Sequence, residues 1–222
     1  MHLVIATRNA HKVQEIRAIL GGAFECLNLR DFPSAPEAIE DADTFEGNAA
    51  KKAATLASWL SSQNSAGGAV VLADDSGLEV DALSGAPGVH SARFAALDNP
   101  SFALGKNSPD AANNEKLLRL LATVPGEKRT ARFRCVLALV AVSSSQISQR
   151  ELATRAQFFQ GACEGRIAFA PSGRGGFGYD PLFIPLGHEQ SFAELGEDVK
   201  NRLSHRAKAL EQLRQYFAST ER

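Results

Sequence analysis

Two adjacent carboxylates interrupt an apolar run in the first half of the chain. In VVLADDSGLEV, residues 70–80, Asp74 and Asp75 follow VVLA, at the expected carboxyl end of a buried strand where open α/β sheets place ligands. Buried carboxylates without partners repel each other and lose their hydration, which is costly unless a cation compensates them. Oxygen ligands with no His or Cys nearby suit Mg²⁺. We therefore expect a Mg²⁺ site, with Ser76 and Gly77 in a tight turn; an Asx turn or helix cap is the alternative.

A second polar segment, TRNAHK at residues 7–12, is expected where a strand ends and a helix begins. Free backbone N–H groups and the positive end of the helix dipole suit such a position to phosphate. Thr7 and Asn9 can donate hydrogen bonds, and Lys12 adds a positive charge. The glycine spacing of a Walker loop is absent, so an ordinary capped helix with a surface lysine is the alternative.

A glycine-rich segment in the last third of the chain could contact a base. PSGRGGFGYDP, residues 171–181, places Phe177 and Tyr179 among four glycines and adds Asp180 as a hydrogen-bond acceptor. Glycines let the backbone approach a ligand closely, and an aromatic ring among them can stack on a base. A flexible surface turn is the alternative interpretation.

Cations gather at the start of the last predicted helix. KNRLSHRAKAL, residues 200–210, contains Lys200, His205 and Arg206, with Ser204 as a helix cap. Positive charge there opposes the helix dipole, which favours a binding role over a merely solvated helix end. Phosphate donors, a metal site, a stacking surface and cations together indicate a nucleotide as ligand.

These polar segments need a scaffold of alternating strands and helices. The sequence predicts strands at residues 2–7, 24–29, 69–73 and 130–142, with one or two more within residues 151–169. It predicts helices that end at Gly21–Gly22, that run from Thr44 to about Ser62, that cover residues 113–124, and that run from about Ser204 to Phe217. Residues 98–110 are expected as an exposed loop, and residues 143–149 as a hairpin connection. The predicted fold class is α/β with a mixed sheet.

The overall composition excludes several classes of protein. The net charge of -1 over 222 residues argues against nucleic acid or an anionic membrane as partner. Three widely spaced cysteines indicate free thiols in a reducing compartment, and the sequence has no apolar run long enough to span a membrane. We therefore expect a cytoplasmic protein.

Five motifs in order make the chain resemble the inosine triphosphate pyrophosphatase family, whose enzymes remove non-standard purine nucleoside triphosphates. The motifs are IATRNAHKVQEI, TFEGNAAKKA, ADDSGLEVDALSGAPGVHSARF, EGRIAFAPSGRGGFGYDPLF and KNRLSHRAKAL. The resemblance implies Mg²⁺-dependent hydrolysis of ITP, dITP and XTP to monophosphate and pyrophosphate. It also implies one two-lobed domain over residues 1–222, built around a long central sheet flanked by helices, and a homodimer.

The resemblance also assigns roles to individual residues. Asp75 is the implied general base and a metal ligand, Glu40 is the second metal ligand, and Lys52 faces the phosphates together with Lys12. The implied substrate contacts are Thr7, Arg8, Asn9, Ala10, His11 and Lys12 in the phosphate loop, Ser76, then Phe177, Gly178, Tyr179 and Asp180 around the base, and Lys200, His205 and Arg206 as purine readers.

The selectivity for 6-oxo purines has a physical explanation. Donors on Arg206 and on a protonated His205 would pair with the oxo group but leave the amino group of adenine unpaired, at a cost of about 1–3 kcal/mol.

One departure from the family pattern is Gly47, which stands where many relatives carry an acid; the acid here is Glu46, and it receives no role. A second is the stretch between Arg93 and Asn113, which is longer than usual. A nucleotide-binding regulatory module without turnover and a phosphatase of modified pyrimidine nucleotides remain the alternatives.

Overall fold

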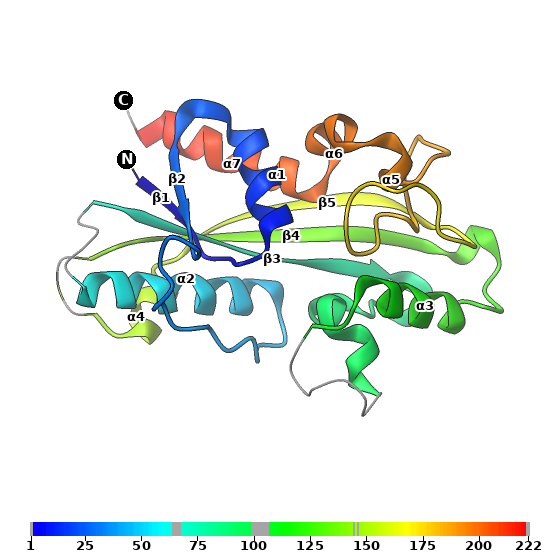
Figure 1. The fold of residues 1–222 in the computed structure, drawn as a ribbon, viewed down its shortest axis with the longest axis horizontal. Coiled ribbons are helices and arrows are strands. Elements are labelled where there is room, and N and C mark those ends of the chain that lie inside the picture. The colour runs from blue at the N-terminus through cyan, green and yellow to red at the C-terminus, as the bar shows by residue number, and fades with distance from the viewer. Residues whose placement is uncertain (1, 64–67, 99–106, 144, 146, 221–222) are drawn as a thin grey trace. The chain divides into compact units, whose positions relative to one another are not determined.

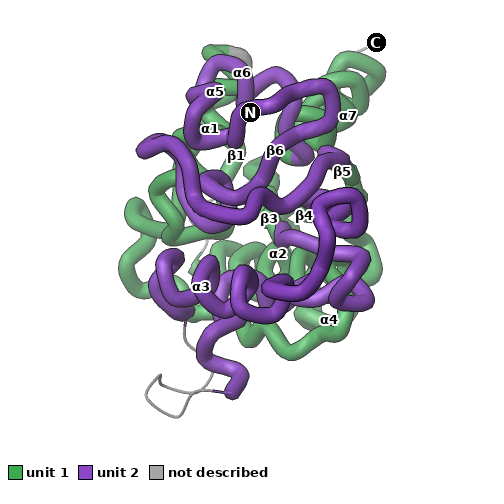
Figure 2. Tube along the Cα trace, turned by 90° about the vertical axis from the view of Figure 1, so that its right-hand side faces the viewer, with its two compact units in different colours: residues 1–75, 135–161, 206–222 green, residues 76–134, 162–205 purple. Residues whose placement is uncertain are grey.

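The computed structural model describes residues 2–63, 68–98, 107–143, 145 and 147–220. The chain divides into two compact units, which Figure 2 shows in different colours. Unit 1 comprises residues 1–75, 135–161 and 206–222, and unit 2 comprises residues 76–134 and 162–205. The chain passes from one unit to the other at the Asp75–Ser76 and His205–Arg206 peptide bonds, among others.

The described strands form one six-stranded mixed sheet, in the order β2-β1-β3-β4-β5-β6. The strands are β1 (His2–Ile5), β2 (Glu25–Asn28), β3 (Val70–Val80), β4 (Thr130–Ala141), β5 (Gln157–Ile167) and β6 (Phe183–Pro185). β1 pairs in parallel with β2 and β3, whereas β5 and β6 pair antiparallel. The predicted mixed α/β fold is therefore confirmed.

Unit 1 contains the amino-terminal and carboxyl-terminal helices. They are α1 (Ala10–Leu20), α2 (Phe45–Ser62), α4 (Gln149–Thr154) and most of α7 (His205–Thr220). In Figure 1, α1 and α7 cover one face of the unit 1 strands, and α2 and α4 lie on the other. The core under α1 and α7 is built from alternating strand residues such as Leu137 and Leu139, and from helix residues such as Ile16, Leu210 and Leu213.

Unit 2 has shorter elements and a core rich in aromatic residues. Its helices are α3 (Asp110–Leu120), α5 (Phe192–Leu195) and α6 (Glu197–Leu203), with a 3₁₀ segment η3 (Gly88–Leu97). The rings of Phe133, Phe183 and Phe192 pack together, with centroids 4.6 to 6.3 Å apart. This core supports the glycine-rich segment that follows β5, and so positions a predicted base-binding loop.

Several sequence predictions are confirmed in detail. Helix α1 ends at Leu20, and the next residue, Gly21, has a φ of 64°, which favours glycine. Helix α2 begins after Thr44, whose side chain accepts a hydrogen bond from Gly47 N at 3.1 Å. Residues 171–181 form neither helix nor strand.

Other predictions are wrong. The tight turn at Ser76 and Gly77 is absent, because β3 continues through them to Val80, so the two carboxylates lie within a strand rather than at its end. No hairpin joins β4 directly to β5, because Ser148 caps the unforeseen helix α4. Helices α5 and α6 were not predicted either. Of the loop expected at residues 98–110, residues 99–106 lie outside the described part of the chain, as do residues 144 and 146 of the expected connection.

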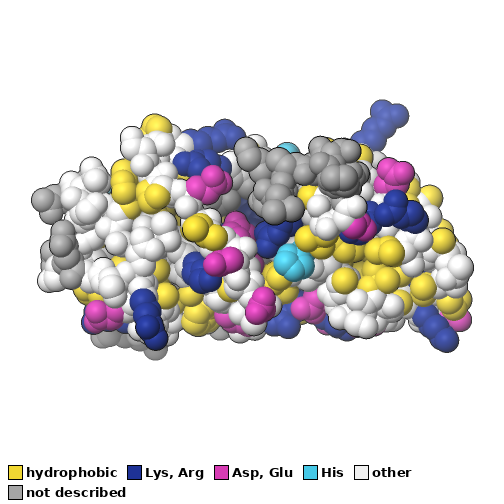
Figure 3. Space-filling view, turned by 90° about the horizontal axis from the view of Figure 1, so that it is seen from below, with side chains coloured by type: hydrophobic (Ala, Val, Ile, Leu, Met, Phe, Trp, Pro, Cys, Tyr) yellow, Lys and Arg dark blue, Asp and Glu magenta, His cyan; other side chains and the backbone are white. Residues whose placement is uncertain are grey.

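The surface carries both signs of charge. On the face drawn in Figure 3, Lys and Arg side chains are interspersed with Asp and Glu rather than gathered into one field. No helix within the described ranges is long and apolar enough to cross a membrane. The three described cysteines, Cys26, Cys135 and Cys163, form no disulfide bond.

Candidate active site

Asp74 and Asp75 lie side by side on β3, and each meets a different lysine. Successive side chains of a strand point to opposite faces of the sheet. Asp74 Oδ1 therefore reaches Lys12 Nζ of α1 at 2.5 Å, and Asp75 Oδ1 reaches Lys52 Nζ of α2 at 2.7 Å. We call these four residues, together with Glu40 and Arg206, the β3 carboxylate cluster; all six belong to unit 1.

Asp74 is fully buried and fully engaged. Besides Lys12, its carboxylate accepts hydrogen bonds from Arg206 Nε at 2.8 Å and from Cys135 Sγ at 3.3 Å. Burial acts to raise the pKa of Asp74, but the charges of Arg206 and Lys12 outweigh it and hold the pKa well below its usual range. Asp74 is thus a permanent anion that fixes the position of Lys12.

Asp75 has a different environment. Lys52 Nζ contacts Asp75 Oδ1 at 2.7 Å and Glu40 Oε2 at 2.9 Å, whereas Asp75 Oδ2 is buried without a hydrogen-bond partner among the described residues. Burial raises the pKa of Asp75, and the lowering effect of Lys52 and Lys12 does not cancel it. Burial would lower the pKa of Lys52, but Asp75 and Glu40 raise it instead. The arrangement is a charged lysine beside an aspartate that is more basic than usual.

The two lysines converge on one main-chain atom. Lys12 Nζ lies 3.5 Å and Lys52 Nζ lies 3.4 Å from the carbonyl oxygen of Asp74. The two ammonium groups are thus held close together, each only slightly exposed and each paired with a carboxylate, in a position from which both can donate hydrogen bonds to an anion such as a phosphate chain.

The predicted phosphate loop is an N-terminal helix cap. Asn9 Oδ1 accepts hydrogen bonds from His11 N at 3.0 Å and from Lys12 N at 3.3 Å, and Thr7 Oγ1 accepts one from Asn9 N at 3.1 Å. A phosphate that binds the amide groups of His11 and Lys12 has to replace the Asn9 side chain. The direct contribution of this segment to the cluster is the ammonium group of Lys12.

The other residues of that loop, and Ser76, lie in ordinary settings. Arg8 donates a hydrogen bond to the carbonyl oxygen of Ala35 at 3.1 Å and keeps about half of its side chain exposed. Ala10 is the first residue of α1, and His11 is exposed beside it. Ser76 is half-buried on β3 and belongs to unit 2. Their roles as substrate contacts stay predictions.

A second cluster lies in unit 2 and is built on the glycine-rich loop. We call Phe177, Gly178, Tyr179, Asp180 and Lys200 the aromatic-loop cluster. Asp180 Oδ2 accepts hydrogen bonds from Phe177 N at 2.8 Å and from Lys200 Nζ at 2.6 Å, and Lys200 Nζ lies 4.3 Å from the centroid of the Phe177 ring. The Asp180–Lys200 pair is buried. Asp180 contacts the backbone of Phe177 and Lys200 contacts its ring, so the pair restrains both parts of this residue.

The two aromatic rings of this loop differ in exposure. Phe177 is half-buried, whereas Tyr179 is only 3% exposed and donates a hydrogen bond from its hydroxyl to Ser91 O at 2.9 Å. Burial, together with the nearby charge of Asp110, raises the pKa of Tyr179. The expectation that Tyr179 offers an open face for stacking is therefore wrong, and Phe177 is the candidate platform.

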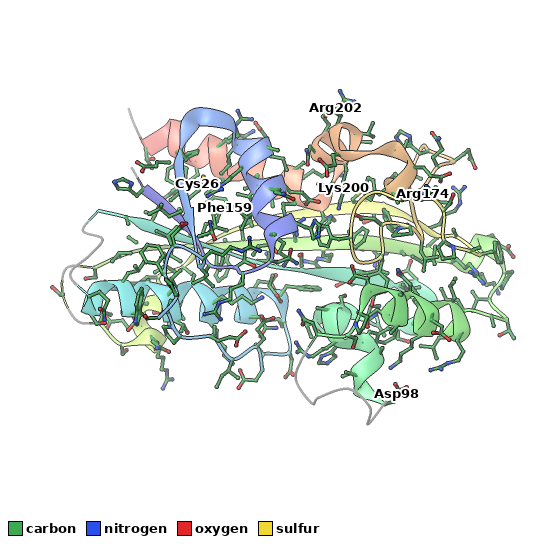
Figure 4. The ribbon with its side chains drawn as sticks, viewed as in Figure 1. Cys26, Asp98, Phe159, Arg174, Lys200 and Arg202 are labelled. Carbon is green, nitrogen blue, oxygen red and sulfur yellow. The ribbon has the colours of Figure 1, made fainter. Side chains whose placement is uncertain are left out.

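The three predicted purine readers have separate partners. His205 is buried in unit 2 and stacks on Phe133, with ring centroids 4.8 Å apart and an interplanar angle of 14°. Lys200 belongs to α6, from which Arg202 projects outward in Figure 4. Arg206 is 1% exposed in unit 1, and its guanidinium pairs with Glu15 as well as with Asp74. A purine-reading role for Arg206 stays a prediction that requires it to leave these carboxylates.

The acidic residues present can accommodate a Mg²⁺ ion only together with other ligands. Within the described ranges, no group of three or more His, Cys, Asp or Glu side chains is placed to hold a metal. Asp75 and Glu40 are nevertheless brought together by Lys52, and Asp75 retains a buried oxygen without a partner. Mg²⁺ commonly binds one or two carboxylates and takes its remaining ligands from water and substrate phosphates, so the two acids fit it.

Sequence reasoning missed four residues that support the two clusters. Glu15 and Cys135 support Arg206 and Asp74 in unit 1. Asp110 and Asn114 of α3 hold Gly178 in unit 2. Asn113 and Asn114 together in a helix were a usable signal, because asparagine is a poor helix former and needs another reason to be there; Glu15 and Cys135 gave no comparable signal.

Comparison with known proteins places the chain in a family. The sequence model described as "Ham1 family" matches residues 3–216. The chain belongs to the Ham1 family. A curated relative from Shouchella clausii, named dITP/XTP pyrophosphatase, is 46% identical over 213 residues, which cover 96% of this chain and 94% of the relative.

Solved structures of Ham1 proteins have the same fold. A HAM1 protein from Coxiella burnetii is 35% identical, with a TM-score of 0.77 and 99% of each chain covered. A protein from Mycobacterium abscessus, titled nucleoside-triphosphatase or dITP/XTP pyrophosphatase, is 36% identical with a TM-score of 0.66; the match covers 96% of this chain and 98% of that one. The family resemblance of the five sequence motifs is thus confirmed.

Proposed function

We propose that this chain hydrolyses non-standard purine nucleoside triphosphates, namely ITP, dITP and XTP, to the monophosphate and pyrophosphate. The observation that carries the proposal is the environment of Asp75: a buried aspartate of raised pKa, with one oxygen on Lys52 and the other without a partner among the described residues, in a chain of the Ham1 family. Relatives with over 40% identity across nearly the whole chain bear the name dITP/XTP pyrophosphatase.

The triphosphate is assigned to residues of unit 1. Lys12 and Lys52 supply two positive charges within 3.5 Å of the same carbonyl oxygen, and both are held in place by buried carboxylates. Cations placed before the reaction begins stabilise charge that develops on the phosphate oxygens and on the leaving pyrophosphate. Asp74 contributes indirectly, because its permanent negative charge positions Lys12.

Asp75 is assigned as the general base. Its carboxylate accepts a proton from a water molecule while the water oxygen forms a bond to the α-phosphorus. The bond from the α-phosphorus to the bridging oxygen breaks at the same centre, and pyrophosphate leaves with that oxygen. A raised pKa makes Asp75 a better proton acceptor than an exposed aspartate, and Lys52 orients it through Oδ1.

Asp75 and Glu40 are the residues that would hold Mg²⁺. When bound, such an ion neutralises phosphate charge and makes bound water more acidic. Lys52 contacts both acids and would keep them in position whether or not the metal is present.

Recognition of the base is assigned to residues of unit 2. Phe177 offers a ring to a purine, and Asp180 and Lys200 fix that ring. His205 is a candidate donor to the 6-oxo group of hypoxanthine or xanthine. A homodimer and a cytoplasmic location remain part of the proposal on the family resemblance alone.

The direct test is a comparison of substrates. Pyrophosphate release should be measured with Mg²⁺ for ITP, dITP and XTP against ATP, dATP and GTP. We expect kcat/KM for the first three to exceed that for ATP and dATP by about 10- to 10²-fold, the range that an unpaired amino group permits. GTP carries the same 6-oxo group, so its rejection must rest on its 2-amino group instead. Equal cleavage of ATP contradicts the purine specificity, and binding of ITP without cleavage indicates a nucleotide sensor instead.

A further inference from the structure

We propose that Asp110 and Asn114 of α3 are positioning residues for base recognition, which hold Gly178 so that the ring of Phe177 stays in place for a 6-oxo purine. This inference rests on the proposed function. It concerns residues to which neither the motifs nor the relatives' names give a role, and all of them lie within unit 2.

The two side chains hold both polar groups of one glycine. Asp110 Oδ2 accepts a hydrogen bond from Gly178 N at 2.7 Å, and Asn114 Nδ2 donates one to Gly178 O at 3.0 Å. The two residues are four positions apart on α3, so they share one face of the helix. Helix α3 thus binds Gly178, the residue that directly follows Phe177, through two hydrogen bonds.

Gly178 gains little restraint from side-chain packing. Its φ is 63°, and a Cβ built on it would meet nothing within 4 Å, so packing does not confine this residue. Glycine reaches positive and negative φ about equally well, which makes it the mobile position of a loop unless hydrogen bonds hold it. A turn closed by the hydrogen bond from Asp180 N to Phe177 O at 3.2 Å already limits Gly178, and the two bonds from α3 add a restraint on both of its own polar groups.

Asn114 is also an unusual residue for its position. It is only 7% exposed, and its Oδ1 is buried without a hydrogen-bond partner among the described residues. A buried unpaired acceptor is costly, so a merely structural helix position would be filled better by an apolar residue. The bond to Gly178 is the one gain that the described contacts show for keeping an amide there.

The presence of an acid at position 110 can also be explained without any role in base recognition. As the first residue of α3, it interacts favourably with the helix dipole whatever it contacts. The test therefore centres on Asn114, with an exposed residue of the same helix, Glu115, as the matched control. Asn114→Leu removes the donor at similar size, Asp110→Ala removes the acceptor, and Glu115→Ala touches neither.

The experiment measures kcat and KM for dITP and XTP in each variant. We expect KM to rise about five- to tenfold in Asn114→Leu and in Asp110→Ala, a fraction of the loss of a full stacking contact, with kcat nearly unchanged. Glu115→Ala should match the wild type. The decisive variant is Asn114→Leu combined with Phe177→Leu: if Asn114 acts through the Phe177 ring, its substitution changes KM little once that ring is gone.

Each outcome separates this inference from the proposed function. A raised KM that is not additive with Phe177→Leu supports the inference. Unchanged KM in an active Asn114→Leu enzyme, or fully additive effects, overturns it and leaves the proposed function intact. A wild-type chain that hydrolyses neither dITP nor XTP contradicts the proposed function, and the base-positioning role with it.

Discussion

Asp74 and Asp75 share a peptide bond on β3, yet they bind different lysines on opposite faces of the sheet, Lys12 and Lys52 respectively. Because successive side chains of a strand point to opposite faces of the sheet, the two adjacent negative charges form two separate ion pairs. The pairs differ in kind: both oxygens of Asp74 are engaged, whereas Asp75 has one oxygen without a partner among the described residues. We therefore expect Asp74 to serve mainly the stability of the fold and Asp75 to serve the reaction, and substitution of each residue tests this difference.

Removal of the charge on Asp75 should stop turnover but spare the fold. Asn at position 75 cannot accept the proton from water, so we expect kcat to fall by about 10²- to 10⁴-fold. Asp41, an exposed partner of the neighbouring Lys51, provides the matched control, because such surface pairs contribute about 0–1 kcal/mol. Asp41→Asn should be fully active. An Asp75→Asn enzyme with a tenth or more of wild-type kcat would exclude Asp75 as the base.

Removal of the charge on Asp74 should instead unfold unit 1 more easily. Asp74→Asn leaves the buried Arg206 and the largely buried Lys12 without their shared anion, and breaking a buried ion pair in this way costs about 3–5 kcal/mol. Urea unfolding at pH 7 measures the loss. Asp74→Asn combined with Arg206→Met should recover part of it. A loss below about 1 kcal/mol would show that Asp74 does not hold these cations.

The raised pKa of Asp75 predicts a specific pH dependence. The base is active only when ionised, so kcat/KM should fall on the acid side. In the metal-free protein, the carboxyl group of Asp75 should titrate above 3.8, the usual aspartate value. The folded state binds this proton more tightly than the unfolded state does. The contribution of Asp75 to stability therefore decreases as pH rises from 3.8 through its folded-state pKa.

Asp74 contributes with the opposite sign. Its pKa is lower in the folded state, so its stabilising contribution is present above 3.8 and is lost as pH falls below that value. Comparison of urea unfolding for wild type, Asp75→Asn and Asp74→Asn across pH separates the two effects. Titration of the Asp75 carboxyl group at or below 3.8 in the metal-free protein would contradict the environment described for Asp75.

Two glycines of the aromatic loop should respond differently to the same substitution. Both have positive φ, so an alanine at either position costs about 1–2 kcal/mol in backbone strain. At Gly176 the added Cβ would also lie 2.2 Å from Asp180 Oδ2, whereas at Gly178 it meets nothing within 4 Å. We therefore expect Gly176→Ala to lose about 1–3 kcal/mol more in urea unfolding. Equal losses would contradict the close packing of Gly176 on Asp180.

Removal of divalent metal should abolish turnover reversibly. Asp75 and Glu40 are too few to form a complete metal site by themselves, so the ion should dissociate readily from the free protein. Dialysis against EDTA should leave no pyrophosphate release from dITP, and added Mg²⁺ should restore it. Full activity in EDTA would exclude the metal from the reaction, and an altered unfolding midpoint in EDTA would show a structural ion instead.

The sequence could predict most elements because their signals are local. Thr44 followed by helix formers predicts α2, and Gly21 predicts the end of α1. The continuation of β3 through Ser76 and Gly77 could not be predicted, because DDSG is also a turn sequence and the strand is part of a sheet in which β3 lies beside β4, far away in the chain. Pairing within the sheet, rather than the local sequence, determines the conformation of this segment.

The candidate site was predictable to a similar extent. Lys12, Lys52 and Asp75, each of which stands in a recognisable motif, lie together in the structure, and their catalytic roles stay predictions. The engagement of Arg206 by Asp74 and Glu15, and the burial of Tyr179, depend on packing that no spacing reveals. Sequence alone thus predicts which residues lie near one another better than it predicts which of their atoms already have hydrogen-bond partners.

The most direct test of the account is the position of the oxygen that water contributes. The enzyme should hydrolyse dITP in H₂¹⁸O with Mg²⁺, and both products should be analysed by mass spectrometry. Attack at the α-phosphorus predicts one ¹⁸O in the dIMP phosphate and none in pyrophosphate. Label in pyrophosphate, or release of free phosphate in place of pyrophosphate, would contradict the central claim that water attacks the α-phosphorus.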